Sequence, residues 1–110
     1  MSAQNPLEIT PAGLQAFTQP VVLLDVREPF EHAIARLDGA RLIPMGYVPT
    51  SLPEIERLSD EALVVVYCHH GIRSLNVVHW LRGQGVDNCV SLAGGIDRWS
   101  REIDASIPRY

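Results

Sequence analysis

Lysine is absent from the sequence, and all nine positively charged side chains are arginines. Enzymes that form a lysine Schiff base, use a lysine general base or bind nucleotides with a Walker-type lysine are therefore excluded. There is also no run of basic residues, and the formal net charge is −4. Because binding to nucleic acid or to anionic membranes depends on a positively charged surface, the sequence predicts neither partner.

Long hydrophobic runs and a secretory leader are absent as well. No window approaches the roughly 20 apolar residues of a membrane span, and the first 11 residues contain no positive segment followed by an apolar one. Two cysteines, Cys68 and Cys89, are too few for a disulfide framework. These features predict a cytoplasmic protein whose thiols are free, catalytic or structural rather than paired.

The length of 110 residues predicts one domain, residues 1–110. Short apolar, β-branched segments alternate along the chain with segments of helical character, and no repeat or linker interrupts them. The predicted strands are 7–9, 21–26, 40–44, 63–67 and 88–92, and the predicted helices are 11–19, 27–35, 49–59, 73–85 and 93–103. This alternation is typical of an α/β fold with a mostly parallel sheet.

Polar residues follow two of the predicted strands directly. Asp25 and Arg27 come at the end of VVLLDV, and Cys68 comes after LVVVY. In open parallel sheets, ligands bind at the carboxyl ends of the strands, where loops lead into helices. If the two strands are neighbours, their exits lie side by side and form the predicted site.

The segment CHHGIRS (68–74) has the residues of an anion cradle around a sulfur nucleophile. A thiol at Cys68 would lie near the positive end of the helix dipole and near unpaired amides, which stabilise a thiolate. Amides from His69 to Arg73 could form an anion-binding nest, and Gly71 permits a backbone conformation that other residues resist. Arg73 supplies a forked donor suited to a small oxyanion. This interpretation requires N–H groups that point inward and a sulfhydryl that solvent can reach.

Four residues separate Cys68 from Arg73, whereas cysteine-dependent phosphatases have five in the corresponding loop. The smaller ring has less room for a tetrahedral phosphate or arsenate but can surround one additional sulfur atom. The loop length therefore favours sulfur transfer over a phosphatase or an arsenate reductase.

Four stretches in the same order make the sequence similar to a single-domain rhodanese: LDVREPFE, DGARLIPM, VVVYCHHGIRS and VSLAGGIDRW. The resemblance implies a five-stranded, mainly parallel sheet with helices on both faces, and no cofactor. It also implies a sulfurtransferase that moves a sulfane sulfur from a donor such as thiosulfate to cyanide or a thiol acceptor through a cysteine persulfide.

The resemblance assigns roles to individual residues. Cys68 matches the family's nucleophile and persulfide carrier, and Asp25 and Arg27 match an element that supports the active loop. The residues that match the loop around the outer sulfur and its closure into the helix are His69, His70, Gly71, Ile72, Arg73 and Ser74. A small-molecule sulfur donor and a thiophilic acceptor are the implied partners, with a persulfide carrier that serves a protein donor or acceptor as the alternative.

Each assignment has a structural alternative. Arg73 could pair with a carboxylate instead of an anion, and the rings of His69 and His70 could face solvent without a role. Cys89 is expected to pack in the core, and Trp80 to anchor it. Adjacent histidines face differently on most backbones, so the sequence predicts no metal site.

Overall fold

The computed structural model describes residues 6–110; residues 1–5, on which part of the prediction about a secretory leader rests, lie outside the described residues. One five-stranded sheet has the order β1-β5-β4-β2-β3, and all its neighbouring strands are parallel. The strands are β1 (Glu8–Ile9), β2 (Val21–Asp25), β3 (Arg41–Leu42), β4 (Leu63–Tyr67) and β5 (Cys89–Leu92). The predicted α/β fold with a mainly parallel sheet is therefore confirmed.

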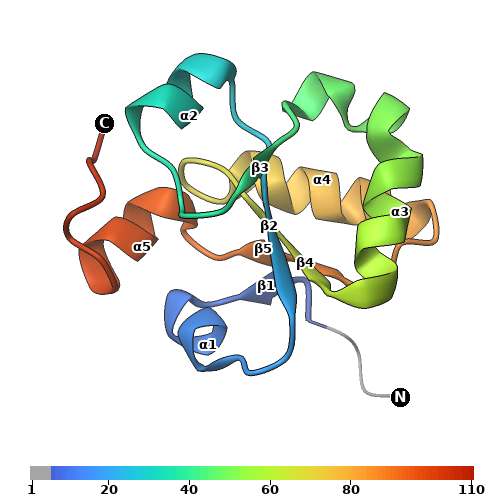
Figure 1. Ribbon diagram of the computed structural model, residues 1–110, viewed down its shortest axis with the longest axis horizontal. Helices are drawn as coiled ribbons and strands as arrows, with labels where there is room; N and C mark the ends of the chain where they lie inside the picture. The colour runs from blue at the N-terminus through green and yellow to red at the C-terminus, as the bar shows by residue number, and fades with distance from the viewer. Residues whose placement is uncertain (1–5) are drawn as a thin grey trace.

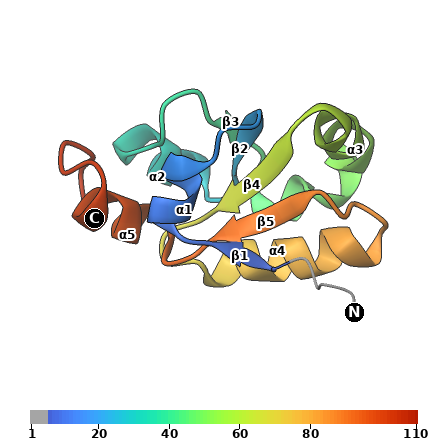
Figure 2. The same cartoon turned by 90° about the horizontal axis from the view of Figure 1, so that it is seen from below.

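Four α-helices connect these strands, and a fifth follows β5. They are α1 (Pro11–Ala16), α2 (Pro29–Ile34), α3 (Leu52–Glu61), α4 (Ile72–Gly83) and α5 (Gly95–Glu102), and two short 3₁₀ turns, η1 (Met45–Tyr47) and η2 (Pro49–Ser51), precede α3. Figure 1 shows α3 and α4 on one side of the sheet and α1 and α5 on the other, and Figure 2 shows α4 along one face. Among the described residues, none of these helices combines the length and apolar character that crossing a membrane would require.

The central strand β4 explains why both faces of the sheet are covered. Its residues alternate between two apolar clusters, with Val64 and Val66 in one cluster and Val65 and Tyr67 in the other. All four are fully buried. Successive side chains of a strand point to opposite faces, so an uninterrupted apolar run requires helices on both sides.

The pairing of β2 with β4 brings the two strand exits together, as the sequence predicts for neighbouring strands. Asp25 is level with Tyr67 in the register, and the amide of Val26 donates a hydrogen bond to the carbonyl of Tyr67 at 3.1 Å. Cys68 directly follows Tyr67, the last residue of β4. Residues from the 25–27 segment and from the 68–74 segment therefore share one edge of the sheet.

Helix α4 differs from the sequence-based expectation in two ways. It begins at Ile72, so Ile72 and Arg73 belong to its first turn rather than to the preceding loop. Trp80 is 37% exposed and lines a groove of about 210 Å³ with Met45 and Pro49, so the prediction that it anchors the core is wrong. The buried residues of the helix recur at intervals of three and four, and Trp80 lies outside that stripe.

Candidate active site

The sulfur of Cys68 accepts hydrogen bonds from main-chain amides of the turn that leads into α4. The Gly71 amide lies 3.1 Å and the Ser74 amide 3.3 Å from Sγ. The Ser74 hydroxyl lies 3.4 Å from the same sulfur and 2.7 Å from the hydroxyl of Ser91, which β5 supplies. Three polar groups therefore converge on the sulfur and can stabilise a thiolate or persulfide anion.

The position of these donors follows from the way α4 begins. Gly71 precedes the helix with φ +101°, a left-handed conformation in which a side chain would be strained, and a Cβ there would lie 3.1 Å from the Gly94 amide. The turn at Gly71 leads into the helix so that the amide of Ser74, in its first turn, faces the sulfur. The first amides of a helix have no partner within it and carry the positive end of its dipole.

Helix α5 binds the other side of the active loop. The amide of Ile96 donates to the carbonyl of Cys68 at 2.9 Å, and the amide of Asp97 donates to the carbonyl of His69 at 3.1 Å. Gly95 has φ +63°, and a Cβ there would lie 2.5 Å from the Cys68 carbonyl oxygen and closer still to that of His69. The start of α5 therefore holds the loop through its carbonyl groups.

The sulfhydryl is less accessible than the sequence-based interpretation requires. Cys68 is 1% exposed and belongs to the apolar cluster that also contains Val66 and Val77. The expectation that solvent reaches the thiol is therefore wrong in this structure. The cause is packing: the residue ends a strand with both faces covered, and the turn folds back over it. The inward-pointing amides at Gly71 and Ser74 are present.

The side chains of the two loop histidines lie together. Their rings stack with centroids 3.9 Å apart, and the ring of Tyr110 stacks on the other face of His69 at 3.9 Å. His70 is exposed, whereas His69 is partly buried and its Nε2 atom has no hydrogen-bond partner. Burial and the neighbouring His70 lower the pKa of His69. This environment favours a neutral His69 over a cation that would stabilise the thiolate.

His69, His70 and Asp97 could hold a metal ion, since their ligand atoms lie within 4.8 Å of one another. The stacked rings contradict the premise that adjacent histidines face apart. Both oxygens of Asp97 also accept hydrogen bonds from arginines, Arg101 at 3.1 Å and Arg109 at 3.0 Å.

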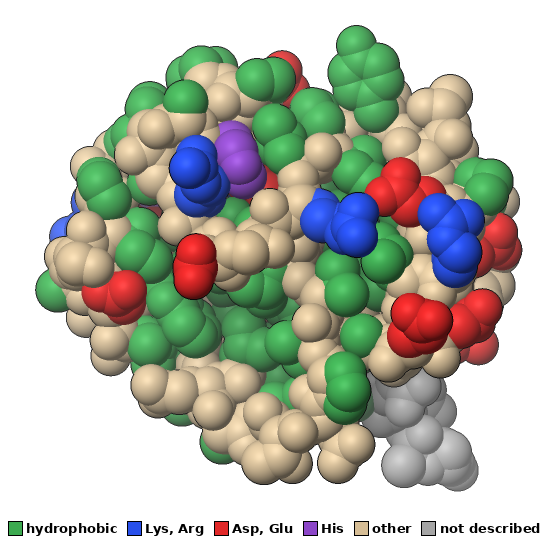
Figure 3. All heavy atoms as spheres, in the orientation of Figure 1, with side chains coloured by type: hydrophobic (Ala, Val, Ile, Leu, Met, Phe, Trp, Pro, Cys, Tyr) green, Lys and Arg blue, Asp and Glu red, His purple; other side chains and the backbone are tan. Residues whose placement is uncertain are grey.

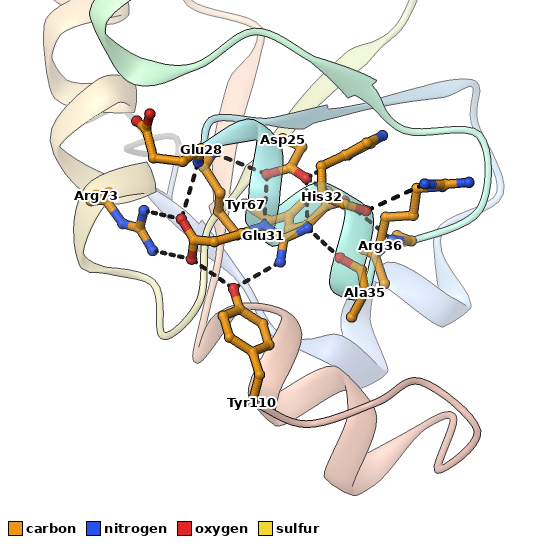
Figure 4. A network of polar contacts seen from close by, with 11 residues as sticks. Asp25, Glu28, Glu31, His32, Ala35, Arg36, Tyr67, Arg73 and Tyr110 are labelled. Atoms are coloured by element: carbon orange, nitrogen blue, oxygen red, sulfur yellow. Dashed lines mark hydrogen bonds and ion pairs between the residues drawn. The ribbon is translucent and has the colours of Figure 1, made fainter.

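Arg73 forms a two-pronged ion pair with Glu31 of α2. Its Nη1 and Nη2 atoms donate to the two carboxylate oxygens at 2.8 and 3.0 Å (Figure 4). The Arg73 side chain is 36% exposed, whereas that of Glu31 is 7% exposed. The sequence leaves open whether Arg73 binds an anion or pairs with a carboxylate. In the structure it pairs with a carboxylate. The side chain of Ile72, the preceding residue, is exposed.

Asp25 and Arg27 form a fully buried pair beneath the active loop. Arg27 donates to the two Asp25 oxygens at 2.8 and 2.6 Å and to the carbonyl of Ala35 at 2.6 Å. Asp25 also receives hydrogen bonds from His32 at 2.9 Å and from the Tyr67 hydroxyl at 3.2 Å. Burial alone would raise the pKa of Asp25, but the hydrogen bonds from Arg27 and His32 outweigh it and lower that pKa.

Tyr110 joins the buried pair to the pair at the loop. Its hydroxyl accepts a hydrogen bond from Arg27 at 2.8 Å and donates one to Glu31 at 2.7 Å (Figure 4). A continuous series of polar contacts therefore runs from Asp25 through Arg27, Tyr110 and Glu31 to Arg73. Sequence reasoning missed Glu31 and Tyr110, because their contacts span 42 and 79 residues and no local pattern marks them.

Cys89 lies apart from these contacts. It is fully buried, its thiol donates to the Val86 carbonyl at 3.3 Å, and burial raises its pKa. A protonated thiol in an apolar environment is a poor nucleophile. The packing role that the sequence predicts for Cys89 agrees with this environment.

Comparisons with known proteins show which family the chain is similar to. The family model of the rhodanese-like domain matches residues 12–102. A protein of Arabidopsis thaliana, the chloroplastic rhodanese-like/PpiC domain-containing protein 12, is 39% identical over 95 residues, which are 86% of this chain and 32% of that protein. A sulfurtransferase of Allochromatium vinosum is 37% identical over 86 residues, 78% of each chain.

Among solved structures, a rhodanese-related protein from Thermoplasma volcanium has a TM-score of 0.78 and 32% identity, over 87% of this chain and 92% of that one. The chain spans about a third or less of the length of several curated relatives, 32% for the Arabidopsis protein and 26% for a Mycobacterium tuberculosis one. With a family model that covers most of the sequence and a matching fold, the chain belongs to the rhodanese-like domain family.

Proposed function

We propose that the protein, as one domain, is a sulfurtransferase that moves a sulfane sulfur from a donor such as thiosulfate to cyanide or a thiol acceptor through a persulfide on Cys68. The observation that carries this proposal is the pair of amides, from Gly71 and Ser74, that bond to Sγ at 3.1 and 3.3 Å. Membership of the rhodanese-like family adds support.

The reaction has two steps. The Cys68 thiolate attacks the outer sulfur of thiosulfate, the sulfur–sulfur bond of the donor breaks, and sulfite leaves with the electron pair. Cyanide or a thiolate then attacks the outer sulfur of the persulfide, and the Cys68 thiolate leaves. The outer sulfur carries negative charge between the steps, so inward-pointing amides of the turn would stabilise the intermediate.

Access to the thiol is part of the proposal, because Cys68 is 1% exposed. The donor reaches Sγ when the 68–71 turn opens. Opening is opposed by the α5 hydrogen bonds to the carbonyls of Cys68 and His69. Small alkylating reagents should therefore modify Cys68 faster than bulky ones, which would need a larger opening.

The direct test is intact-mass analysis after incubation with excess thiosulfate. The reduced protein should gain the mass of one sulfur atom, and the gain should disappear after addition of cyanide. Cys68→Ser should abolish the adduct, and Cys89→Ala, the same residue type at a buried position, should retain it. An unmodified Cys68 after incubation with thiosulfate and with a persulfide donor would refute the proposal.

A persulfide carrier that receives sulfur from a protein donor is the second candidate. The pairing of Arg73 with Glu31 favours it, because that pairing occupies the cation expected to bind a small anionic donor. A carrier would form the same Cys68 adduct but turn over thiosulfate slowly. Transfer of sulfur to or from a second protein, measured by mass on both proteins, separates the two roles.

A phosphatase or arsenate reductase is disfavoured by the short loop and by the Arg73 pairing, and Cys68-dependent hydrolysis of an aryl phosphate would revive it.

We place the reaction in the cytoplasm, since it needs a reduced thiol and both cysteines are free. The proposed partners are a small sulfur donor and a thiophilic acceptor, or a protein in either role, and not nucleic acid or a membrane.

A further inference from the structure

The ion pair between Arg73 and Glu31 changes the charge that an incoming donor meets. Arg73 stands in the first turn of α4, one residue before Ser74, whose amide bonds to the sulfur. Its guanidinium is the cation nearest in sequence to the sulfur-binding turn. Two parallel hydrogen bonds at 2.8 and 3.0 Å hold both of its terminal nitrogens on Glu31. An anionic donor would have to displace the carboxylate or bind without this cation.

The carboxylate of Glu31 is itself firmly held. Besides the two bonds from Arg73, it accepts hydrogen bonds from the Tyr110 hydroxyl at 2.7 Å and from the Glu28 amide at 3.0 Å (Figure 4). The hydrogen bonds from Arg73 dominate the shift that lowers the pKa of Glu31 to about 2. Glu31 therefore stays negatively charged at every pH at which the enzyme would be assayed, and the pair persists.

We infer that Glu31 is a specificity-determining residue: by occupying Arg73 it disfavours dianionic donors such as thiosulfate and favours sulfane donors of lower charge, such as thiosulfonates and alkyl persulfides. This inference rests on the proposed sulfur transfer at Cys68. All these donors react by the same step, in which the thiolate takes the outer sulfur and the rest of the donor leaves with the electron pair. They differ in the charge that must be brought to the site.

The charge dependence gives the inference a quantitative signature. Coulomb energy is proportional to the charge of the donor, so a released guanidinium favours a dianion twice as much as a monoanion on the free-energy scale. Because rate constants depend exponentially on free energy, the gain for a dianion is the square of the gain for a monoanion. A gain of about threefold for a monoanion thus corresponds to about tenfold for a dianion.

The experiment compares Glu31→Gln with the unmodified protein, using thiosulfate as the dianion and methanethiosulfonate as the monoanion. We expect kcat/KM to rise about tenfold with thiosulfate and about threefold with methanethiosulfonate. The double variant Glu31→Gln/Arg73→Met should lose both gains, because no guanidinium remains to be released. Equal gains for the two donors, no gain with either, or gains that survive in the double variant would overturn the inference.

Glu54→Gln is the matched control for net charge. Glu54 pairs with Arg41 at 3.3 Å on an exposed surface, in the region of α3 where positive and negative side chains intermix in Figure 3. The substitution removes one negative charge from an arginine–carboxylate ion pair without touching Arg73. We expect kcat/KM to change by less than about twofold with either donor.

A second variant keeps the inference testable if Glu31→Gln unfolds. Glu31→Asp shortens the side chain by one methylene and should lengthen its two hydrogen bonds to Arg73, so it should raise the thiosulfate rate in the same direction but less. A fall in the ratio of thiosulfate to methanethiosulfonate rates would count against the inference. Saturating donor followed by intact-mass analysis tests sulfur transfer separately: a Cys68 adduct with unchanged donor preference refutes only the role of Glu31.

Discussion

Substitution of Gly95 by alanine tests whether α5 positions the active loop. The residue has φ +63°, and an added Cβ would come within 2.5 Å of the Cys68 carbonyl oxygen. That contact is with backbone, which cannot rotate away as a flexible side chain can. Either the loop or the start of α5 must therefore move, and the hydrogen bonds from Ile96 and Asp97 to the loop carbonyls would lengthen or break.

The magnitude has two parts. A non-glycine residue in the left-handed region costs about 1 kcal/mol, and forcing extra volume into a packed position costs about 1–3 kcal/mol more. The expected loss of unfolding free energy is therefore about 2–4 kcal/mol. For a domain of this size, 1 kcal/mol corresponds to roughly 4 °C in the unfolding midpoint, so Gly95→Ala should lower Tm by about 8–16 °C.

Gly39→Ala is the control, because Gly39 has φ +77° and an added Cβ there would meet nothing within 4 Å. The Gly39→Ala substitution has the cost of a left-handed backbone without a steric contact, so it should lower Tm by about 4 °C. Thermal unfolding by circular dichroism gives both values, and the rate of Cys68 adduct formation at 20 °C below each midpoint gives the effect on the loop. Equal midpoints for the two variants, with equal rates, would refute the proposed contact between α5 and the loop.

Three further predictions concern the other charged and sulfur-bearing residues. Asp25→Asn leaves the buried charge of Arg27 without its ionic partner and should destabilise the protein by about 3 kcal/mol, measured by denaturant unfolding. The carboxyl group of Glu31 has its pKa lowered from 4.5 to about 2, so its contribution to stability is complete above about pH 5 and is lost as the pH falls to 2. Unfolding free energies measured across this window should fall by about 1–3 kcal/mol more in the unmodified protein than in Glu31→Gln. Cys89→Ala should destabilise by about 1 kcal/mol and leave adduct formation at Cys68 unchanged within about twofold, as rates from intact mass will show.

The fold was predictable from the sequence because its strands are marked by local runs of apolar residues. The run LVVVY is apolar at every position, which requires cover on both faces, and the structure places alternate residues in two separate clusters. The exposure of Trp80 was not predictable, because apolar residues wrap most of this helix and the sequence does not say which of them face the sheet. In the structure α4 buries Ser74, Val77, Val78 and Leu81, a stripe that leaves Trp80 aside.

The candidate site was predictable only as far as its local segments extend. The turn conformation at Gly71 follows from the residue type, whereas the proximity of the two strand exits follows only once β2 and β4 are neighbours, which the sequence leaves as a condition. The partner of Arg73 does not, because Glu31 lies 42 residues earlier and is brought to it by the packing of α2. The burial of Cys68 was also missed, since it results from the turn closing over a strand end rather than from any neighbour in sequence.

Two elements contact the 68–74 segment, helix α5 through main-chain carbonyls and Glu31 through a side chain. Helix α5 binds the carbonyls of Cys68 and His69, and a planar trans peptide points each carbonyl opposite to the following N–H, so the amides of His69 and His70 point away from α5. Glu31 contacts the 68–74 segment through the side chain of Arg73. Formation of a persulfide should therefore depend on the backbone and on α5. Donor choice should depend on side chains around the loop, which explains how one fold could retain the sulfur chemistry while changing the donor.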